Sequence, residues 1–273
     1  MDNSYPGGAP PDGHFKGKGS ADISVRQQQS AEVNSDSIRQ DRNVLPPQKH
    51  KHTAVGIDGC HAGWIAAIRE PGGQLRSQLA AHVTEILDPL PPDSVILIDM
   101  IIGLPEAGES QRECDQQARR RLRPHGSRFF PAPPRAAIGS ASYPEACRLA
   151  RAATGKAISK QCWHLFQKIR ELDTVSDFRI RESHPELAFA KLNGDRPIAA
   201  SKKNATGQAE RLKLLDAALP GSGELYVGLI RNTLRRDVAR DDALDALALC
   251  AVARTPDALR RIPEEGTGPA IWY

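Results

Sequence analysis

The sequence predicts an α/β domain in which helices cover a mixed β-sheet. Apolar residues make up 40 % and charged residues 26 % of the 273 residues, which is the balance of a globular protein. Short apolar runs separated by turn residues come first in the folded part, and helical patterns dominate after them. Strands that are followed by strands alternating with helices are typical of a mixed sheet with helices packed on it.

The N-terminal residues 1–52 are expected to form a disordered tail. They are rich in Gly, Pro, Ser, Gln and Asp, and their few apolar residues follow no period. Such a segment cannot bury enough apolar surface to offset the entropy that is lost on ordering. We therefore expect the folded domain to span residues 53–273.

Five strands are expected, over residues 53–58, 64–70, 74–83, 94–101 and 178–183. Residues 71–73, Pro-Gly-Gly, form a turn between the second and third of them, and two tight turns in succession predict antiparallel neighbours. The run 94–101 is apolar nearly throughout, as expected for a central strand that is covered on both faces.

Helical patterns occupy most of the remaining chain. The expected helices are 110–122, 143–153, 159–173, 186–192, 206–218 and 240–253. Ser110 is the expected N-cap of the first helix, and the proline-rich stretch 125–139 predicts a loop.

Acidic residues stand at unusual places in this pattern. Asp58 ends the first strand, Asp99 lies inside the apolar fourth strand, and Glu182 closes the fifth. Asp242 and Asp245 are three residues apart on the last helix, so they share a face of it. An aspartate after a strand is also a common turn former, and acids near a helix N-terminus are favoured by the helix dipole.

Asp99 is the hardest of these acids to explain as a surface residue. Four apolar residues precede it and three follow it, and burial of an unpaired charge costs several kcal/mol. Either a basic side chain or a divalent cation must therefore neutralise it. Oxygen ligands without cysteine or paired histidine favour Mg²⁺ or Mn²⁺ over zinc.

Basic residues gather in the stretch 119–128, and Arg135 follows shortly after it. The candidates for binding substrate phosphates are Arg120, Arg128, Arg135, Lys168 and Lys202. Guanidinium groups suit phosphate oxygens, but a charged run also commonly solvates a helix face or forms salt bridges. The formal net charge of +4 is compatible with a nucleic-acid partner without establishing one.

Nine blocks of the sequence resemble a known family. In order they are VGIDGCHAGW, LIDMIIGLP, RECDQQARRRL, FFPAPPRAAI, SKQCWHLFQKIRELD, ESHPELAFAKL, SKKNATGQAERLKLL, DDALDALAL and the terminal IWY. Together they resemble the domain-of-unknown-function family 429, described as predicted RNase-H-like nucleases, over about residues 54–273.

The resemblance implies an RNase-H-like mixed sheet, with three antiparallel strands and then parallel strands, related to RuvC-type resolvases. It implies metal-binding acids at Asp58, at Glu182 or Asp99, and at Asp242 with Asp245. Glu186 is a further candidate. We expect Asp58, Glu182 and Asp242 to bind Mg²⁺ or Mn²⁺, with Asp99 or Asp245 completing the catalytic set.

The leading hypothesis is a metal-dependent nuclease that acts on nucleic acid. The alternative is a non-catalytic module on the same fold that binds nucleic acid or protein, with the acids neutralised by Arg120, Lys168 or Lys202. A sugar-kinase or actin-like ATPase ranks lower, because the foldable part is short for two such lobes.

The expected setting is the cytoplasm. Five cysteines without a CxxC pair fit reduced thiols, and the N-terminus lacks the apolar core of a secretory signal. Because no apolar run approaches the length of a membrane-spanning helix, we expect no membrane association.

Overall fold

The computed structural model describes residues 51–106, 108–109, 111–126 and 129–273. The expected disordered tail therefore falls almost wholly outside the described residues, as do Ser110 and Arg128. None of the helices in the described ranges is long and apolar enough to cross a membrane. All five cysteines are buried free thiols.

The sheet elements are short and the helices are numerous. The strands are β1 (Ala54–Cys60), β2 (Gly63–Arg69), β3 (Leu75–Ala80), β4 (Val95–Asp99), β5 (Ile180–Glu182), β6 (Arg261–Ile262) and β7 (Ile271–Trp272). The helices are α1 (Thr84–Leu87), α2 (Glu113–Arg121), α3 (Arg135–Ile138), α4 (Tyr143–Thr154), α5 (Lys160–Asp173), α6 (Pro185–Leu192), α7 (Ala205–Ala218), α8 (Ser222–Asn232) and α9 (Arg240–Ala253), with a 3₁₀ turn at Pro256–Ala258.

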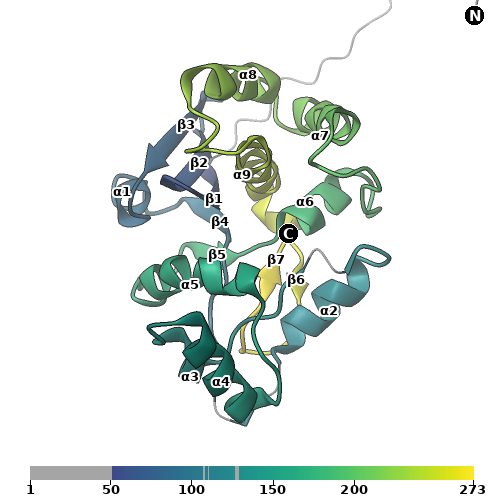
Figure 1. Ribbon diagram of the computed structural model, residues 1–273. Coiled ribbons are helices and arrows are strands. Elements are labelled where there is room, and N and C mark those ends of the chain that lie inside the picture. Colours follow the sequence, from purple (N-terminus) through teal and green to yellow (C-terminus); the bar gives the residue numbers. More distant parts are fainter. Residues whose placement is uncertain (1–50, 107, 110, 127–128) are drawn as a thin grey trace, which may run out of the picture. The chain divides into compact units, whose positions relative to one another are not determined.

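The main sheet has the strand order β3-β2-β1-β4-β5 (Figure 1). β1, β2 and β3 are antiparallel neighbours, whereas β4 and β5 run parallel to β1. This confirms the expected mixed sheet of three antiparallel strands followed by parallel strands. The parallel pairing brings the C-terminal ends of β1 and β4 to the same edge of the sheet, where Asp58 lies beside Asp99.

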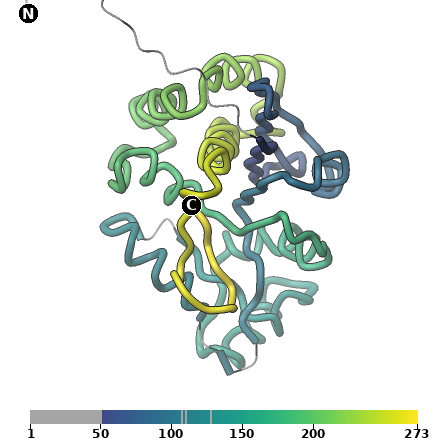
Figure 2. The backbone as a smooth tube through the Cα atoms, turned by 180° about the vertical axis from the view of Figure 1, so that it is seen from behind, coloured from purple at the N-terminus to yellow at the C-terminus, as the bar shows by residue number. Residues whose placement is uncertain are grey.

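Helices cover both faces of this sheet, and the alternation of side chains along each strand sorts the core into two layers. On one face Val55 and Ile57 pack with α1, α4 and α5. On the other face Ala54 and Leu97 pack with α6, α7, α8 and α9. Figure 2 shows from behind the yellow-green tube of α9 beside the purple tube of the first strands. β1 and β4 are apolar nearly throughout because both of their faces are covered.

α9 approaches β1 unusually closely, and Gly56 permits it. A Cβ atom at Gly56 would stand 2.1 Å from the carbonyl oxygen of Ala246 and 2.2 Å from the backbone nitrogen of Cys250. The absence of a side chain therefore brings the helix backbone against the strand. Because Asp245 precedes Ala246, this contact also fixes the distance between Asp245 and the end of β1.

The structure corrects several expected elements. The helix expected over 110–122 begins at Glu113, and the stretch 125–139 expected as a loop contains α3. Neither α8 nor the β6–β7 pair was expected from sequence. α8 carries glycine and β-branched residues, which have low helix propensity, and packing of its buried Tyr226 against the core compensates for this.

Candidate metal centre

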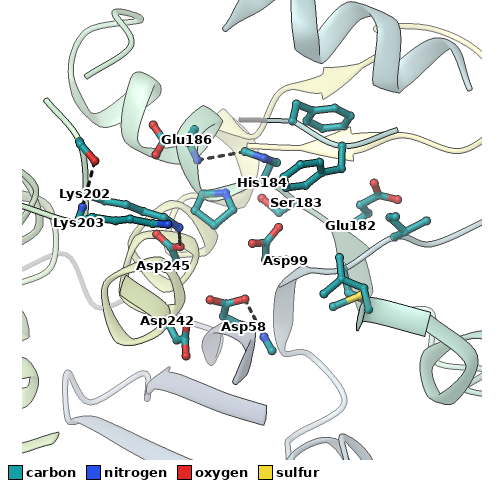
Figure 3. A pocket seen from close by; sticks show the side chains of 18 residues that line it. Asp58, Asp99, Glu182, Ser183, His184, Glu186, Lys202, Lys203, Asp242 and Asp245 are labelled. Carbon is teal, nitrogen blue, oxygen red and sulfur yellow. Dashed lines mark hydrogen bonds and ion pairs between the residues drawn. The ribbon is translucent and has the colours of Figure 1, made fainter. Parts of the chain in front are cut away.

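Three aspartates from three elements meet at the C-terminal edge of the sheet. Asp58 belongs to β1 and Asp99 to β4, and the two are directly paired in the parallel register. Asp245 comes from α9, which packs across these strands. One carboxylate oxygen from each of the three lies within 4.8 Å of the other two, and Figure 3 shows the side chains converging. We call Asp58, Asp99 and Asp245 the aspartate cluster.

Two members of the aspartate cluster are buried and the third, Asp99, is half-buried, and the cluster has few compensating partners. Asp58 is 7 % exposed and Asp245 is 2 % exposed. Asp58 accepts a 2.7 Å hydrogen bond from the backbone N–H of Gly59. Oδ1 of Asp245 is buried and has no hydrogen-bond partner among the described residues. A buried carboxylate oxygen without a donor is costly unless a cation is bound beside it.

The electrostatics of the cluster favour a bound positive charge. Burial, together with the neighbouring Asp99 and Asp245, raises the pKa of Asp58 well above its ordinary value. Burial and the charge of Asp245 raise the pKa of Asp99 to about 8. Carboxylates this close repel one another when ionised, so protons or a cation must neutralise part of their charge.

Lys202 supplies some of the neutralising charge. Its ammonium group donates a hydrogen bond to Oδ2 of Asp245 and lies 3.7 Å from Asp241. Burial lowers the pKa of Lys202, but Asp245 and Asp58 outweigh this effect and keep it well above its ordinary value. When ionised, the three carboxylates of the cluster exceed the one lysine charge by two, which is the charge of one divalent cation.

Glu182 lies near the cluster but is engaged elsewhere. Arg112 donates two hydrogen bonds of 2.7 Å to its carboxylate, and the backbone N–H of Ile102 donates a third, also of 2.7 Å. β5 pairs Glu182 with Ile98, one residue before Asp99, so its side chain points to the other face of the sheet. Of the two alternatives left open by the sequence, Asp99 is therefore the one placed in the cluster.

Glu186, the further candidate, is also held by an arginine. The fully buried Arg211 donates hydrogen bonds of 2.9 and 3.1 Å to the two carboxylate oxygens of Glu186. Nδ1 of His184 accepts from the backbone N–H of Glu186 at the start of α6. Two buried arginine–glutamate pairs thus flank the aspartate cluster and leave its charge unchanged.

Asp242 has a second role at the start of α9. Its carboxylate accepts a 2.9 Å hydrogen bond from the backbone N–H of Ala239, so it caps the helix N-terminus. It still lines the cavity beside the cluster, and burial raises its pKa to about 6. Asp242 therefore lies beside the aspartate cluster, and Asp245 is the residue of α9 that belongs to it.

Among the expected phosphate-binding residues that the structure describes, only Lys202 lines this cavity. Arg120 is exposed on α2 and contacts the carbonyl oxygen of Gln116. Arg135 forms surface ion pairs with Glu106 and Asp173. Lys168 lies 5.5 Å from the centre of the Trp64 ring, and Arg128 lies outside the described residues.

The cavity beside the cluster has a volume of about 410 Å³. Asp58, Asp99, Asp242 and Asp245 contribute to its acidic part, and Lys202 and Lys203 form its basic part. The arginine-bound Glu182 and Glu186 also line it. Its apolar lining is Met100, Ile101, Phe129, Phe130 and Leu165. A recess that combines a few converging charges with apolar walls is the usual form of a small-molecule or substrate site.

Sequence reasoning did not identify the buried arginines or the aromatic lining of this site. Nothing in the sequence distinguishes Arg112 or Arg211 from the many exposed arginines, because their partners lie 70 and 25 residues away, respectively. Phe129 and Phe130 lie in the proline-rich stretch that was interpreted only as a loop. The adjacent Phe-Phe pair was the available signal, since connecting segments often carry binding residues.

Binding of Mn²⁺ is expected to raise the melting temperature more at pH 8 than at pH 5.5. The raised pKa values of Asp58, Asp99 and Asp242 mean that protons compete with the cation at the lower pH. Differential scanning fluorimetry with Mn²⁺ and with excess EDTA at both pH values measures the difference. An equal rise at both pH values would show that binding occurs away from these carboxylates.

Comparison with known proteins gives one family match. A family model described as Protein of unknown function (DUF429) matches residues 56–267, well over half of the chain, and this span contains the entire aspartate cluster. No curated protein and no solved structure matches the chain.

Proposed function

Because the chain belongs to the DUF429 family, whose matching model is described as a protein of unknown function, we propose a function from the site itself: hydrolysis of nucleic-acid phosphodiesters with Mg²⁺ or Mn²⁺ held by the aspartate cluster. The observation that carries the proposal is the meeting of Asp58, Asp99 and Asp245 within 4.8 Å at one edge of the sheet. The mixed sheet is also the arrangement that the resemblance to RNase-H-like nucleases implies.

The cluster fits a hard divalent cation. All of its ligand atoms are carboxylate oxygens, which Mg²⁺ and Mn²⁺ prefer. Oδ1 of Asp245 is buried without a hydrogen-bond donor among the described residues, so it is available as a ligand. The excess negative charge in the cluster matches one divalent ion. When bound, such an ion lowers the pKa of water and stabilises a leaving oxygen.

The surrounding residues would orient a phosphate rather than bind the cation. Lys202 and Lys203 line the cavity beside the carboxylates and would attract a phosphate group to its entrance. Glu182, held by Arg112, fixes the backbone N–H of Ile102 and so positions the segment that follows Asp99. These contacts would hold the carboxylates in place while substrate binds.

Cleavage assays test the proposal directly. Purified protein is incubated with single-stranded and structured DNA and RNA in Mg²⁺, in Mn²⁺ and in EDTA. We expect cleavage that requires a divalent cation. Lack of cleavage of every substrate in both metals would contradict the proposal, and cleavage that persists in EDTA would contradict its metal dependence.

The Lys202–Asp245 ion pair favours a second candidate, a non-catalytic binding module in which lysine neutralises the acids. The two candidates differ in their response to metal. A cation site raises the melting temperature with Mn²⁺, whereas a pocket satisfied by lysine alone does not. Three carboxylates around one lysine charge favour the metal site over the lysine-neutralised pocket.

A further inference from the structure

We propose that the cavity beside the aspartate cluster binds one nucleotide unit with an unpaired base, so that the substrate strand is single-stranded nucleic acid and not a duplex. This inference rests on the proposed function and specifies its substrate class. It follows from the depth of the carboxylates, the size of the cavity and the nature of its walls.

The carboxylates lie at the base of a recess. Asp58 and Asp245 are 7 % and 2 % exposed, so a phosphate can reach them only from inside the cavity. A double helix carries its phosphates on a convex outer surface and keeps its bases paired inside. Its backbone therefore cannot enter a recess of this kind while the base beside the phosphate stays paired.

The size of the cavity suits a single nucleotide. Its volume of about 410 Å³ falls in the range that encloses a ligand the size of a small drug, which is also the size of a nucleoside monophosphate. An unpaired nucleotide can turn its base away from its phosphate. The phosphate can then lie at the carboxylate end while the base occupies the rest of the cavity.

The apolar lining provides a surface for that base. Phe129 is buried and its ring lies 5.1 Å from the ring of His184, so it belongs to the packed wall. Phe130, in contrast, is only partly buried and lines the cavity together with Leu165 and Ile101. Aromatic rings accept any base by stacking, which contributes about 1–3 kcal/mol per base and is independent of sequence.

The lysines complete the pattern. Lys202 and Lys203 line the same cavity, and Lys203 is exposed where a strand would enter. Acidic, basic and apolar parts of the lining thus correspond to the cation, the phosphate and the base of one nucleotide. A purely structural acidic cluster would need neither the second lysine nor the partly exposed phenyl ring.

Binding measurements without turnover test this inference. Fluorescence anisotropy is measured with a labelled single-stranded oligonucleotide and with a hairpin duplex of matched length, in Ca²⁺ to suppress cleavage. The variants are Phe130→Ala and, as a matched control, Phe178→Ala, because Phe178 is 89 % exposed and lines a different groove. We expect the single strand to bind more tightly than the duplex. Phe130→Ala should weaken single-strand binding about 5- to 150-fold, and Phe178→Ala should leave it unchanged.

Two results would overturn the inference: duplex binding as tight as single-strand binding, or unchanged affinity in Phe130→Ala. The wild-type comparison of strand with duplex holds even if the variant folds poorly. The melting temperature in Mn²⁺ separates the two proposals, because Phe130→Ala should keep the metal-dependent rise. If the wild type shows no such rise, the metal centre fails independently of the binding result.

Discussion

Asp99→Asn is expected to lower metal-dependent cleavage at least about 100-fold and, at the same time, to stabilise the metal-free protein at pH 8. The two effects have one cause. A carboxylate oxygen of Asp99 lies within 4.8 Å of those of Asp58 and Asp245. It is therefore a ligand when a cation is bound, and it repels its neighbours when no cation is bound. Asparagine keeps the size of the side chain and removes its charge.

The direction of the stability effect follows from the pKa of Asp99, which is about 8 in the folded protein against an ordinary value of 3.8. A raised pKa means that folding favours the protonated acid, so its contribution to stability is complete below pH ~4 and is lost as the pH rises through ~8. The wild type without metal should therefore lose stability over this interval by an amount on the order of a few kcal/mol, and the variant should lose less, because only the raised pKa values of the remaining acids still contribute.

Melting temperatures in EDTA at pH 5 and pH 8, together with cleavage rates in Mn²⁺, measure both effects. Asp93→Asn is the matched control, because Asp93 is exposed in the turn before β4 and lies outside the cavity. The control should behave like the wild type in both assays. If Asp99→Asn cleaves as fast as the wild type, or is less stable than it in EDTA at pH 8, Asp99 is not part of a repulsive metal-binding cluster.

The sequence was sufficient to predict that acids from distant elements converge. Asp58 follows a strand and Asp245 lies on an apolar helix, and each of these positions also has a local explanation. Asp99 interrupts an apolar run and is hard to explain without a partner. Parallel strands bring such ends to one edge of the sheet, which the structure confirms for Asp58 and Asp99. A charged residue within an apolar stretch is a local feature, so it can be recognised from a single sequence.

Which acids meet depends on register, and register is not a local property. β5 pairs one residue out of step with Asp99, and this single offset turns Glu182 towards Arg112. In the same way, the α-helical position of Asp242 at the third residue of α9 commits it to the backbone of Ala239. Choosing between Asp99 and Glu182 required the alignment of strands that are about 80 residues apart in sequence.

The basic residues were predicted less well for a related reason. Arg120 and Arg135 belong to a basic part of the sequence that suggests phosphate binding. In the structure both lie at the surface, where Arg120 contacts the backbone of its own helix and Arg135 pairs with acids. Lys202 lies in a turn with no distinctive pattern, and it reaches Asp245 only because the segment before α7 folds over the N-terminal end of α9. The long flexible side chains of lysine and arginine make their targets a property of the tertiary structure.

Arg112→Met is expected to destabilise the protein by about 3–5 kcal/mol, which is a large part of the stability of an ordinary domain. Arg112 is 5 % exposed and is the cationic partner of Glu182. It also donates to Asp115 at 2.5 Å and to the carbonyl oxygens of Ile102 and Gly103 at 2.9 and 3.2 Å. Methionine fills a similar volume but leaves two buried carboxylates without their cation.

The loss in the free energy of unfolding should be largest at pH values where the carboxylates of Glu182 and Asp115 are ionised. A second substitution should partly reverse it. Because an apolar pair can replace a buried ion pair with little cost, Arg112→Met combined with Glu182→Leu should recover at least about half of the lost free energy. Asp115 limits the recovery, although it keeps a 2.8 Å hydrogen bond from the backbone N–H of Ala132. Urea denaturation of the single and double variants measures the free energy that Arg112→Met loses and the part that the double variant recovers.

Arg135→Met provides the matched control for this experiment. Its guanidinium also forms two ion pairs, with Glu106 and Asp173, but its side chain is 40 % exposed and those pairs are in contact with solvent. Solvent screening makes such pairs worth less than about 1 kcal/mol, so this variant should unfold at nearly the same urea concentration as the wild type. Equal losses in Arg112→Met and Arg135→Met would mean that burial of Glu182 does not depend on Arg112. The loop after Asp99 would then have to be held in place by packing alone.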